Sequence, residues 1–88
     1  MLKVSSQRKF DKDFERMKKR GNNLKKLGEV IELLANEKIL PAKNCNHKLI
    51  GEFKGCWECH VEPDWLLVYR KTSTELILMR MGKHSDLF

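Results

Sequence analysis

The N-terminal half of the chain spaces its apolar residues as helices do. Phe10, Phe14 and Met17 recur at intervals of four and three, with charged residues between them, which is the pattern of an amphipathic helix. A short β-rich run at residues 2–4 and a serine able to cap free N–H groups precede this stripe. After the break at Gly21, a second stripe begins at residue 24 and predicts another helix ending near Lys38. We therefore expect a strand followed by a helical hairpin.

The C-terminal half favours strands. Helical spacing disappears over residues 40–54, where prolines, asparagines and glycines indicate an extended connection. A strand-like run follows at residues 56–61, and Glu-Pro-Asp-Trp at residues 62–65 has the composition of a tight turn. Two further β-rich runs, at residues 65–70 and 75–81, are separated by a polar stretch and predict a β-hairpin. The remaining C-terminal residues are too few for an independent element.

The predicted order βααβββ indicates an α+β fold. Helices that precede a run of consecutive strands favour a small, mainly antiparallel sheet with both helices packed on one face. The other face of the sheet is then left free. With 88 residues, the chain is expected to form one domain spanning residues 1–88, since so short a chain closes only one modest core.

Charge points to an anionic partner. Eighteen Lys and Arg residues against twelve Asp and Glu residues give a net charge of +6, which favours binding to RNA or to an acidic protein. Simple solubility is the alternative explanation. The longest apolar runs, such as Trp65 to Tyr69, are far short of the roughly 20 residues that cross a bilayer. The N-terminal residues do not resemble an export signal, so we expect a cytoplasmic protein.

Three cysteines raise the question of a metal or haem site. An odd number of cysteines without an export signal argues against a disulfide framework. Cys56-Trp-Glu-Cys59-His60 matches the short pattern for covalent haem attachment, and Cys45 and His47 would complete a set of zinc ligands. However, residues i and i+3 of a regular strand point to opposite faces, so Cys56 and Cys59 could chelate one ion only in a broken strand. We expect no metal and no cofactor.

All the histidines fall in the C-terminal half, among other groups suited to acid–base chemistry. RNA cleavage by the neighbouring 2′-OH requires a base, an acid and a cation near the phosphate, and needs no metal. The unperturbed pKa of histidine, about 6.5, suits either proton role. Spacing alone also allows each histidine to be an ordinary polar surface residue. The candidate groups are His47, His60, Glu62, Asp64, Arg80 and His84.

Several short motifs resemble one family of toxins. The segments lie at residues 46–51, 53–55, 59–69 and 80–88, and include His-Val-Glu-Pro-Asp-Trp and the ending Gly-Lys-His-Ser-Asp-Leu-Phe. In combination they resemble the YafQ-like branch of the RelE/ParE toxins. The resemblance covers about half of the chain directly. The helical hairpin is compatible with that family, although its own sequence is not specific.

The resemblance implies a fold, an activity and a set of roles. It implies a microbial-ribonuclease-like fold that cleaves mRNA, usually on the ribosome, and is inhibited by a DNA-binding antitoxin of the RelB or DinJ kind. By motif position, the catalytic group comprises His47, His60, Asp64 and His84, with Trp65 and Phe88 at its rim and Arg80 as a phosphate-binding cation. The favoured division places His60 with Asp64 on the base side and His84 as the acid. Glu62 is a lower-ranked substrate-binding candidate.

Other interpretations of the same residues remain open. Trp65 and Phe88 are equally suited to packing in the core or rim as to stacking on bases. The fold could also serve a non-catalytic toxin, as in the ParE branch, or a basic RNA-binding module that does not cut, with or without zinc. The presence of the histidines favours the enzyme, because a protein that only binds has no need for them.

Overall fold

The structure is a computed structural model that describes residues 1–51 and 55–88. Phe53 and Lys54, which belong to one of the family motifs, lie outside the described residues. In chain order the elements are β1 (Lys3–Ser6), α1 (Arg8–Lys19), α2 (Leu24–Ala35), the 3₁₀ turn η1 (Ala42–Asn44), β2 (His47–Lys48), β3 (Trp57–Glu62), β4 (Trp65–Lys71), β5 (Glu75–Gly82) and α3 (His84–Leu87).

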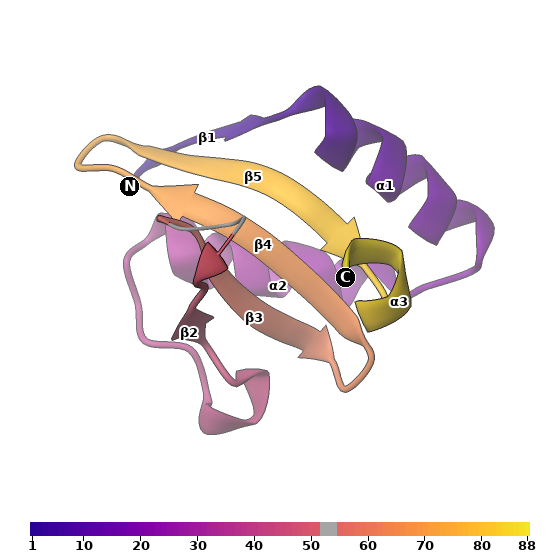
Figure 1. The fold of residues 1–88 in the computed structure, drawn as a ribbon. Coiled ribbons are helices and arrows are strands. Elements are labelled where there is room, and N and C mark those ends of the chain that lie inside the picture. Colours follow the sequence, from indigo (N-terminus) through magenta and orange to yellow (C-terminus); the bar gives the residue numbers. More distant parts are fainter. Residues whose placement is uncertain (52–54) are drawn as a thin grey trace.

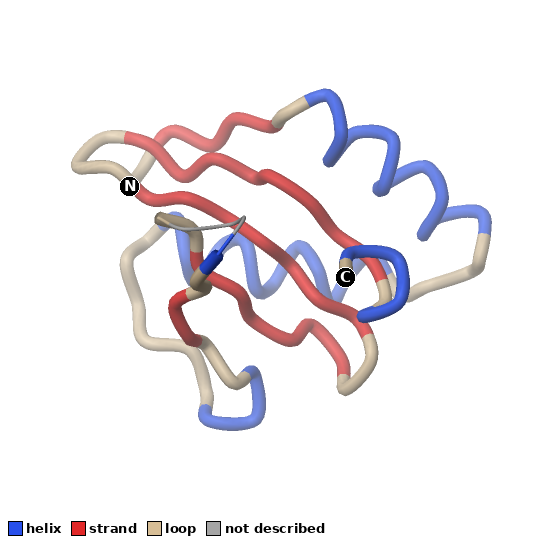
Figure 2. Tube along the Cα trace, in the orientation of Figure 1, coloured by secondary structure: helices blue, strands red, loops and turns tan. Residues whose placement is uncertain are grey.

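The strands form one mainly antiparallel sheet. Their order is β1-β5-β4-β3-β2, with β1 parallel to β5 and every other neighbouring pair antiparallel. Helix α2 crosses behind the sheet, while α1 runs beside β5 beyond the end of β1 (Figure 1). Figure 2 shows the same layering, with the short α3 beside the far end of β5. The α+β prediction, with two helices against a mainly antiparallel sheet, is confirmed.

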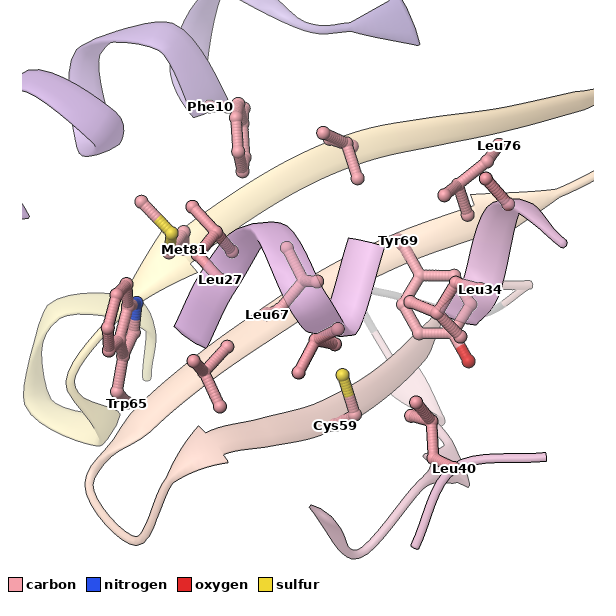
Figure 3. Packing of buried hydrophobic residues seen from close by; sticks show 14 of the residues in the cluster. Phe10, Leu27, Leu34, Leu40, Cys59, Trp65, Leu67, Tyr69, Leu76 and Met81 are labelled. Carbon is pink, nitrogen blue, oxygen red and sulfur yellow. The ribbon is translucent and has the colours of Figure 1, made fainter. Parts of the chain in front are cut away.

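One face of the sheet packs against the helices and forms the core. The predicted helical stripes supply Phe10 and Met17 from α1 and Leu27 and Leu34 from α2, and all four are buried. Strand residues facing them in Figure 3 include Cys59, Trp65, Leu67, Tyr69, Leu76 and Met81. Burying a large apolar side chain stabilises a fold by about 1.5–3 kcal/mol. This face therefore supplies most of the driving force for folding.

Three details of the predicted elements were wrong. The serines expected to cap the first helix lie in β1, and Gln7 occupies the N-cap position of α1 without a side-chain capping hydrogen bond. Helix α2 ends at Ala35 rather than near Lys38, because Asn36 donates its side-chain amide to the carbonyl of Glu32 at 2.9 Å and Glu37 takes a positive φ of 57°. A residue with positive φ directly after the C-cap ends a helix. The C-terminal residues also form a helical turn, α3, in which the Lys83 N–H donates to the Asp86 carboxylate at 2.8 Å.

The other face of the sheet carries polar groups beside the buried Leu66 and Val68, so it is not left free as expected. Glu58 and His60 on β3 alternate with the core residues Cys59 and Val61, so they point away from the helices. A bulge between β4 and β5 leaves Met79 without a paired residue on β4. Bulges of this kind redirect neighbouring side chains. No helix in residues 1–51 or 55–88 combines the length and apolar character required to cross a membrane.

Candidate active site

Two histidines share one carboxylate on the polar face of the sheet. His47 begins β2 directly opposite Glu58 on β3, and its Nε2 lies 3.4 Å from Oε1 of Glu58. Nε2 of His60 lies 3.8 Å from the same oxygen. Nδ1 of His47 is 2.7 Å from the carbonyl oxygen of Cys45, so this nitrogen carries a proton and Nε2 faces the carboxylate. These three residues, His47, Glu58 and His60, are called here the histidine–glutamate cluster.

Sequence reasoning missed Glu58. Its side chain is only 8% exposed, and a carboxylate this buried ordinarily has a partner. The available signal was its position two residues before His60 in a predicted strand, because side chains at i and i+2 share a face. A charged residue on the same face as a candidate catalytic histidine is itself a candidate.

Two asparagines hold the connection that leads into β2. Asn44 donates its amide to the carbonyl of His60 at 2.6 Å, and the Tyr69 hydroxyl donates to Oδ1 of Asn46 at 2.6 Å. Burial, with the nearby Cys59 adding to it, raises the pKa of Tyr69 to about 12, so its hydroxyl keeps the proton that this bond requires. His47 therefore follows a segment anchored to both β3 and β4.

Arg80 is held by a buried carboxylate from α1. Its Nε–H donates to Oδ2 of Asp13 at 2.6 Å, and its Nη2–H donates to Oδ1 at 3.2 Å. The hydrogen bonds to Asp13 raise the pKa of Arg80 above its usual value. Its Nη1 group has no hydrogen-bond partner among residues 1–51 and 55–88. That group remains available to an oxyanion such as a phosphate.

His84 lies at the start of α3, beyond the end of β5. Its backbone N–H is 3.5 Å from Oδ1 of Asp64, which comes from the turn between β3 and β4. Its ring packs against the ring of Phe88, with 5.1 Å between the ring centroids. Phe88 is 56% exposed, so an aromatic surface borders the histidine.

Strand register places these groups on one face. His47 pairs with Glu58, Glu58 with Val68, and Val68 with Arg80, one residue from each of four adjacent strands. Directly paired residues of antiparallel strands point to the same side of a sheet. Neighbouring strands are about 4.8 Å apart, so the backbones of Glu58 and Arg80 lie about 10 Å apart. The histidine–glutamate cluster and the cation therefore lie on the same face of the sheet, on either side of the buried Val68.

Comparison with known proteins identifies the family. Residues 2–88 match the family described as "Bacterial toxin of type II toxin-antitoxin system, YafQ". The chain belongs to the YafQ toxin family. The resemblance predicted from the sequence motifs is thereby confirmed.

Individual relatives and solved structures agree over almost the whole chain. The mRNA interferase toxin YafQ of Escherichia coli K12 is 40% identical over 80 residues, covering 90% of this chain and 87% of that protein. A copper-bound mutant toxin from Helicobacter pylori superposes with a TM-score of 0.95 at 41% identity, covering all of both chains. The toxin in the Escherichia coli DinJ–YafQ complex gives a TM-score of 0.91 at 36% identity, covering 99% of this chain and 97% of that chain.

Within this YafQ fold, the structure also places three further candidate site residues. Trp65 is only 1% exposed and packs in the core, so its ring offers no face to a nucleotide base in this structure. Glu62 forms a partly exposed ion pair with Lys26 at 3.6 Å. Asp64 contacts the backbone of His84, and it is Glu58 that lies beside His60. The carboxylate beside His60 is therefore that of Glu58, while the predicted role of Asp64 on the base side stays a prediction.

The cysteines differ from one another in burial. Cys56 and Cys59 are buried and Cys45 is exposed, and all three are free thiols. Burial raises the pKa of Cys59 to about 12, and this disfavours the thiolate that binds metals. Within residues 1–51 and 55–88, no three His, Cys, Asp or Glu side chains are grouped so that they could hold a metal ion.

Proposed function

We propose that this chain is an endoribonuclease that acts as a toxin by cleaving mRNA in the cytoplasm. The related Escherichia coli protein is named an mRNA interferase, and the net charge of +6 suits a polyanionic substrate. The observation that carries the proposal is the shared face of the sheet, with the histidine–glutamate cluster in register with Arg80 and with His84 just beyond β5.

The proposed reaction is attack by the ribose 2′-OH on the adjacent phosphorus. His60, beside Glu58, removes the hydroxyl proton, and a bond forms between O2′ and phosphorus. Arg80 stabilises the extra negative charge on the phosphate oxygens. The bond from phosphorus to O5′ then breaks, and His84 donates a proton to O5′. The products are a 2′,3′-cyclic phosphate and a free 5′-OH, so atoms and charges balance without a water molecule.

The remaining candidate residues hold or border the reacting groups. His47 shares Glu58 with His60, so it holds the carboxylate and contributes positive charge when protonated. Asp64 accepts from the His84 backbone N–H and fixes the start of α3. Phe88, beside the His84 ring, offers an exposed surface on which a base can stack.

End-group analysis of the cleaved RNA tests this chemistry. A defined RNA incubated with the purified chain in EDTA should yield 2′,3′-cyclic or 3′-phosphate ends and 5′-OH ends. A matched RNA carrying a single 2′-deoxy nucleotide at the cleavage position should resist cutting there. Products with 5′-phosphate and 3′-OH ends would overturn the mechanism. A parallel series with added Cu²⁺ determines whether copper, present in the Helicobacter pylori relative, alters the rate.

We further propose that the substrate is presented by the ribosome. His47 and His84 are both exposed, with 50% of the His47 side chain accessible, so the fold itself provides little to align a flexible strand. An assembly that already orders mRNA would supply that alignment. Cleavage of the same message with and without ribosomes tests this, and equal rates in both cases would contradict it.

The toxin is proposed to be inhibited by a small protein antitoxin like DinJ, which forms a complex with the Escherichia coli relative. An acidic partner that folds on binding would complement the net charge. Induction of this chain alone should arrest growth, and co-expression of its antitoxin should restore it. Growth arrest that persists in a His60→Ala, His84→Ala double variant, with mRNA intact, would favour a non-catalytic toxin.

A further inference from the structure

The carboxylate of Asp13 is a buried junction between α1 and the end of β5. It is 2% exposed and accepts two N–H groups of Arg80, the Met81 backbone N–H at 3.0 Å, and Nη2 of Arg16 at 2.8 Å. Bonds between charged groups are stronger than neutral ones and hold more specific geometry. Asp13 therefore fixes both the backbone of β5 and the direction of the Arg80 guanidinium.

A second carboxylate repeats this arrangement for α3. Asp86 accepts two bonds from Arg20, at 2.8 and 3.3 Å, and one from the Lys83 backbone N–H at 2.8 Å. Arg16 lies 3.9 Å from Asp86 while also bonded to Asp13. Arg16 thus bridges the two carboxylates. The charged side chains of this network contact one another in the order Arg80, Asp13, Arg16, Asp86 and Arg20.

A glycine at the end of β5 leaves room for the side chains of this network. Gly82 has a φ of +154°, and a Cβ placed there would lie 2.9 Å from Oδ2 of Asp86 and 3.1 Å from Nη2 of Arg16. Contacts this short require the neighbouring side chains to move. Because Gly82 has no side chain, Asp86 and Arg16 can pack against the backbone that joins β5 to α3.

We propose that Asp13 and Asp86, joined by Arg16, are positioning residues for the reaction: Asp13 orients Arg80 toward the phosphate, and Asp86 holds the turn that carries His84. This inference rests on the proposed roles of Arg80 and His84. The network anchors the cation and the acid to α1, a helix that itself contributes no group to the reaction. A displacement of about 1 Å in such groups can lower a rate by about 100-fold.

The test compares Asp13→Asn with Glu15→Gln. Both variants remove one negative charge from α1, but Glu15 is exposed on that helix and takes part in no hydrogen bond or ion pair among the described residues. Asp13→Asn should lower single-turnover cleavage by about tenfold to hundredfold, with RNA affinity little changed. Glu15→Gln should leave the rate unchanged. Equal rates for both variants would overturn the inference.

A double-mutant cycle separates positioning from loss of stability. In an Arg80→Ala background, Asp13→Asn should cause little further loss, because the group that it orients is already absent. A full additional loss in that background would indicate a purely structural role for Asp13. If Arg80→Ala itself cleaves normally, the proposed function of Arg80 fails instead, so the two failures are distinct.

NMR supplies a readout that does not depend on activity. The Nε–H of Arg80 should exchange slowly and resonate at an unusual shift in the wild type, and both features should be lost in Asp13→Asn. Asp86→Asn should leave that signal in place while shifting the resonances of His84, with a smaller loss of rate. An Arg80 signal unchanged by Asp13→Asn would overturn the inference. Asp86→Asn lies outside the core, so it tests the Asp86 half of the inference even if Asp13→Asn unfolds. Unchanged His84 resonances and an unchanged cleavage rate in Asp86→Asn would overturn that half.

Discussion

The two sides of the candidate site are held in different ways. In the histidine–glutamate cluster, the nitrogens of His47 and His60 lie 3.4 and 3.8 Å from one shared oxygen of Glu58. On the other side, Arg80 contacts Asp13 at 2.6 Å, and Arg20 contacts Asp86 at 2.8 Å. The first side is loosely arranged around a single acceptor, whereas the second is fixed by short bonds between opposite charges.

This difference follows from the elements that carry each side. His47 belongs to β2, a two-residue strand at the sheet edge, and follows an irregular connection anchored by Asn44 and Asn46. Arg80 lies on the eight-residue strand β5, which packs against α1 and both neighbouring strands. A phosphate-binding cation gains from a fixed position, and the bonds of Arg80 to the buried Asp13 supply it.

The largest expected effect concerns the fixed side. His84→Ala removes the proposed acid and should lower the cleavage rate by about 10²–10⁴-fold, with RNA binding little changed. Ser85→Ala, an exposed change in the same helical turn, serves as the control and should cleave normally. Single-turnover kinetics with a labelled RNA measures both. Full activity in His84→Ala would remove this residue from the acid role.

The next largest effect concerns the histidine–glutamate cluster. Glu58→Gln keeps the shape of the side chain but removes the charge shared by the two histidines. Residues that act as one unit couple by about 0.5–3 kcal/mol, so the rate should fall by up to about 100-fold. Combined with His60→Ala, the loss should be less than the product of the single losses. Independent, multiplying losses would show that Glu58 and His60 do not work together.

The sequence predicted those parts of the molecule that follow a regular period. The stripe containing Phe10, Phe14 and Met17 gave α1, and the β-rich runs gave β3 to β5, because burial on one face imposes spacing on the chain. The four-residue helix α3 has too few residues for a period to appear. The site motifs marked His60 and His84 through family resemblance, which periodicity alone does not provide.

What the sequence did not reveal depends on contacts between distant residues. Asp13 lies within the apolar stripe of α1, between Phe10 and Met17, but its partner Arg80 is 67 positions away. The pairing arises only when α1 lies beside β5. The exchange of Asp64 for Glu58 beside His60 has a similar cause, since strand alternation and not sequence distance decides which carboxylate faces the ring.

The third prediction tests the fixed side through its backbone. Gly82→Ala should destabilise the fold by about 1–3 kcal/mol, because it combines an unfavourable φ with contacts to Asp86 and Arg16. Gly28→Ala, in an open position on α2, should instead stabilise by about 0.5–1 kcal/mol. Chemical denaturation measures both changes. A neutral Gly82→Ala would show that the junction accommodates a methyl group and is less closely fixed than proposed.

The smallest expected effect is the pH dependence of the Asp86 contact. The hydrogen bond from Arg20, supported by the Lys83 N–H and the charge of Arg16, lowers the pKa of Asp86 to about 2. The carboxyl group of an unfolded chain has an ordinary pKa of about 3.9, so the contact stabilises the folded state fully above that value. This stabilisation is lost as the pH falls toward 2. The free energy of unfolding of wild type should therefore exceed that of Asp86→Asn by a constant amount above about pH 5, and the two should converge in acid.

The contact is partly exposed, so added salt should reduce the difference. A difference that stays the same from pH 6 to pH 2 would show that Asp86 contributes through packing, and the fixed side of the site would then owe its order to Asp13 alone.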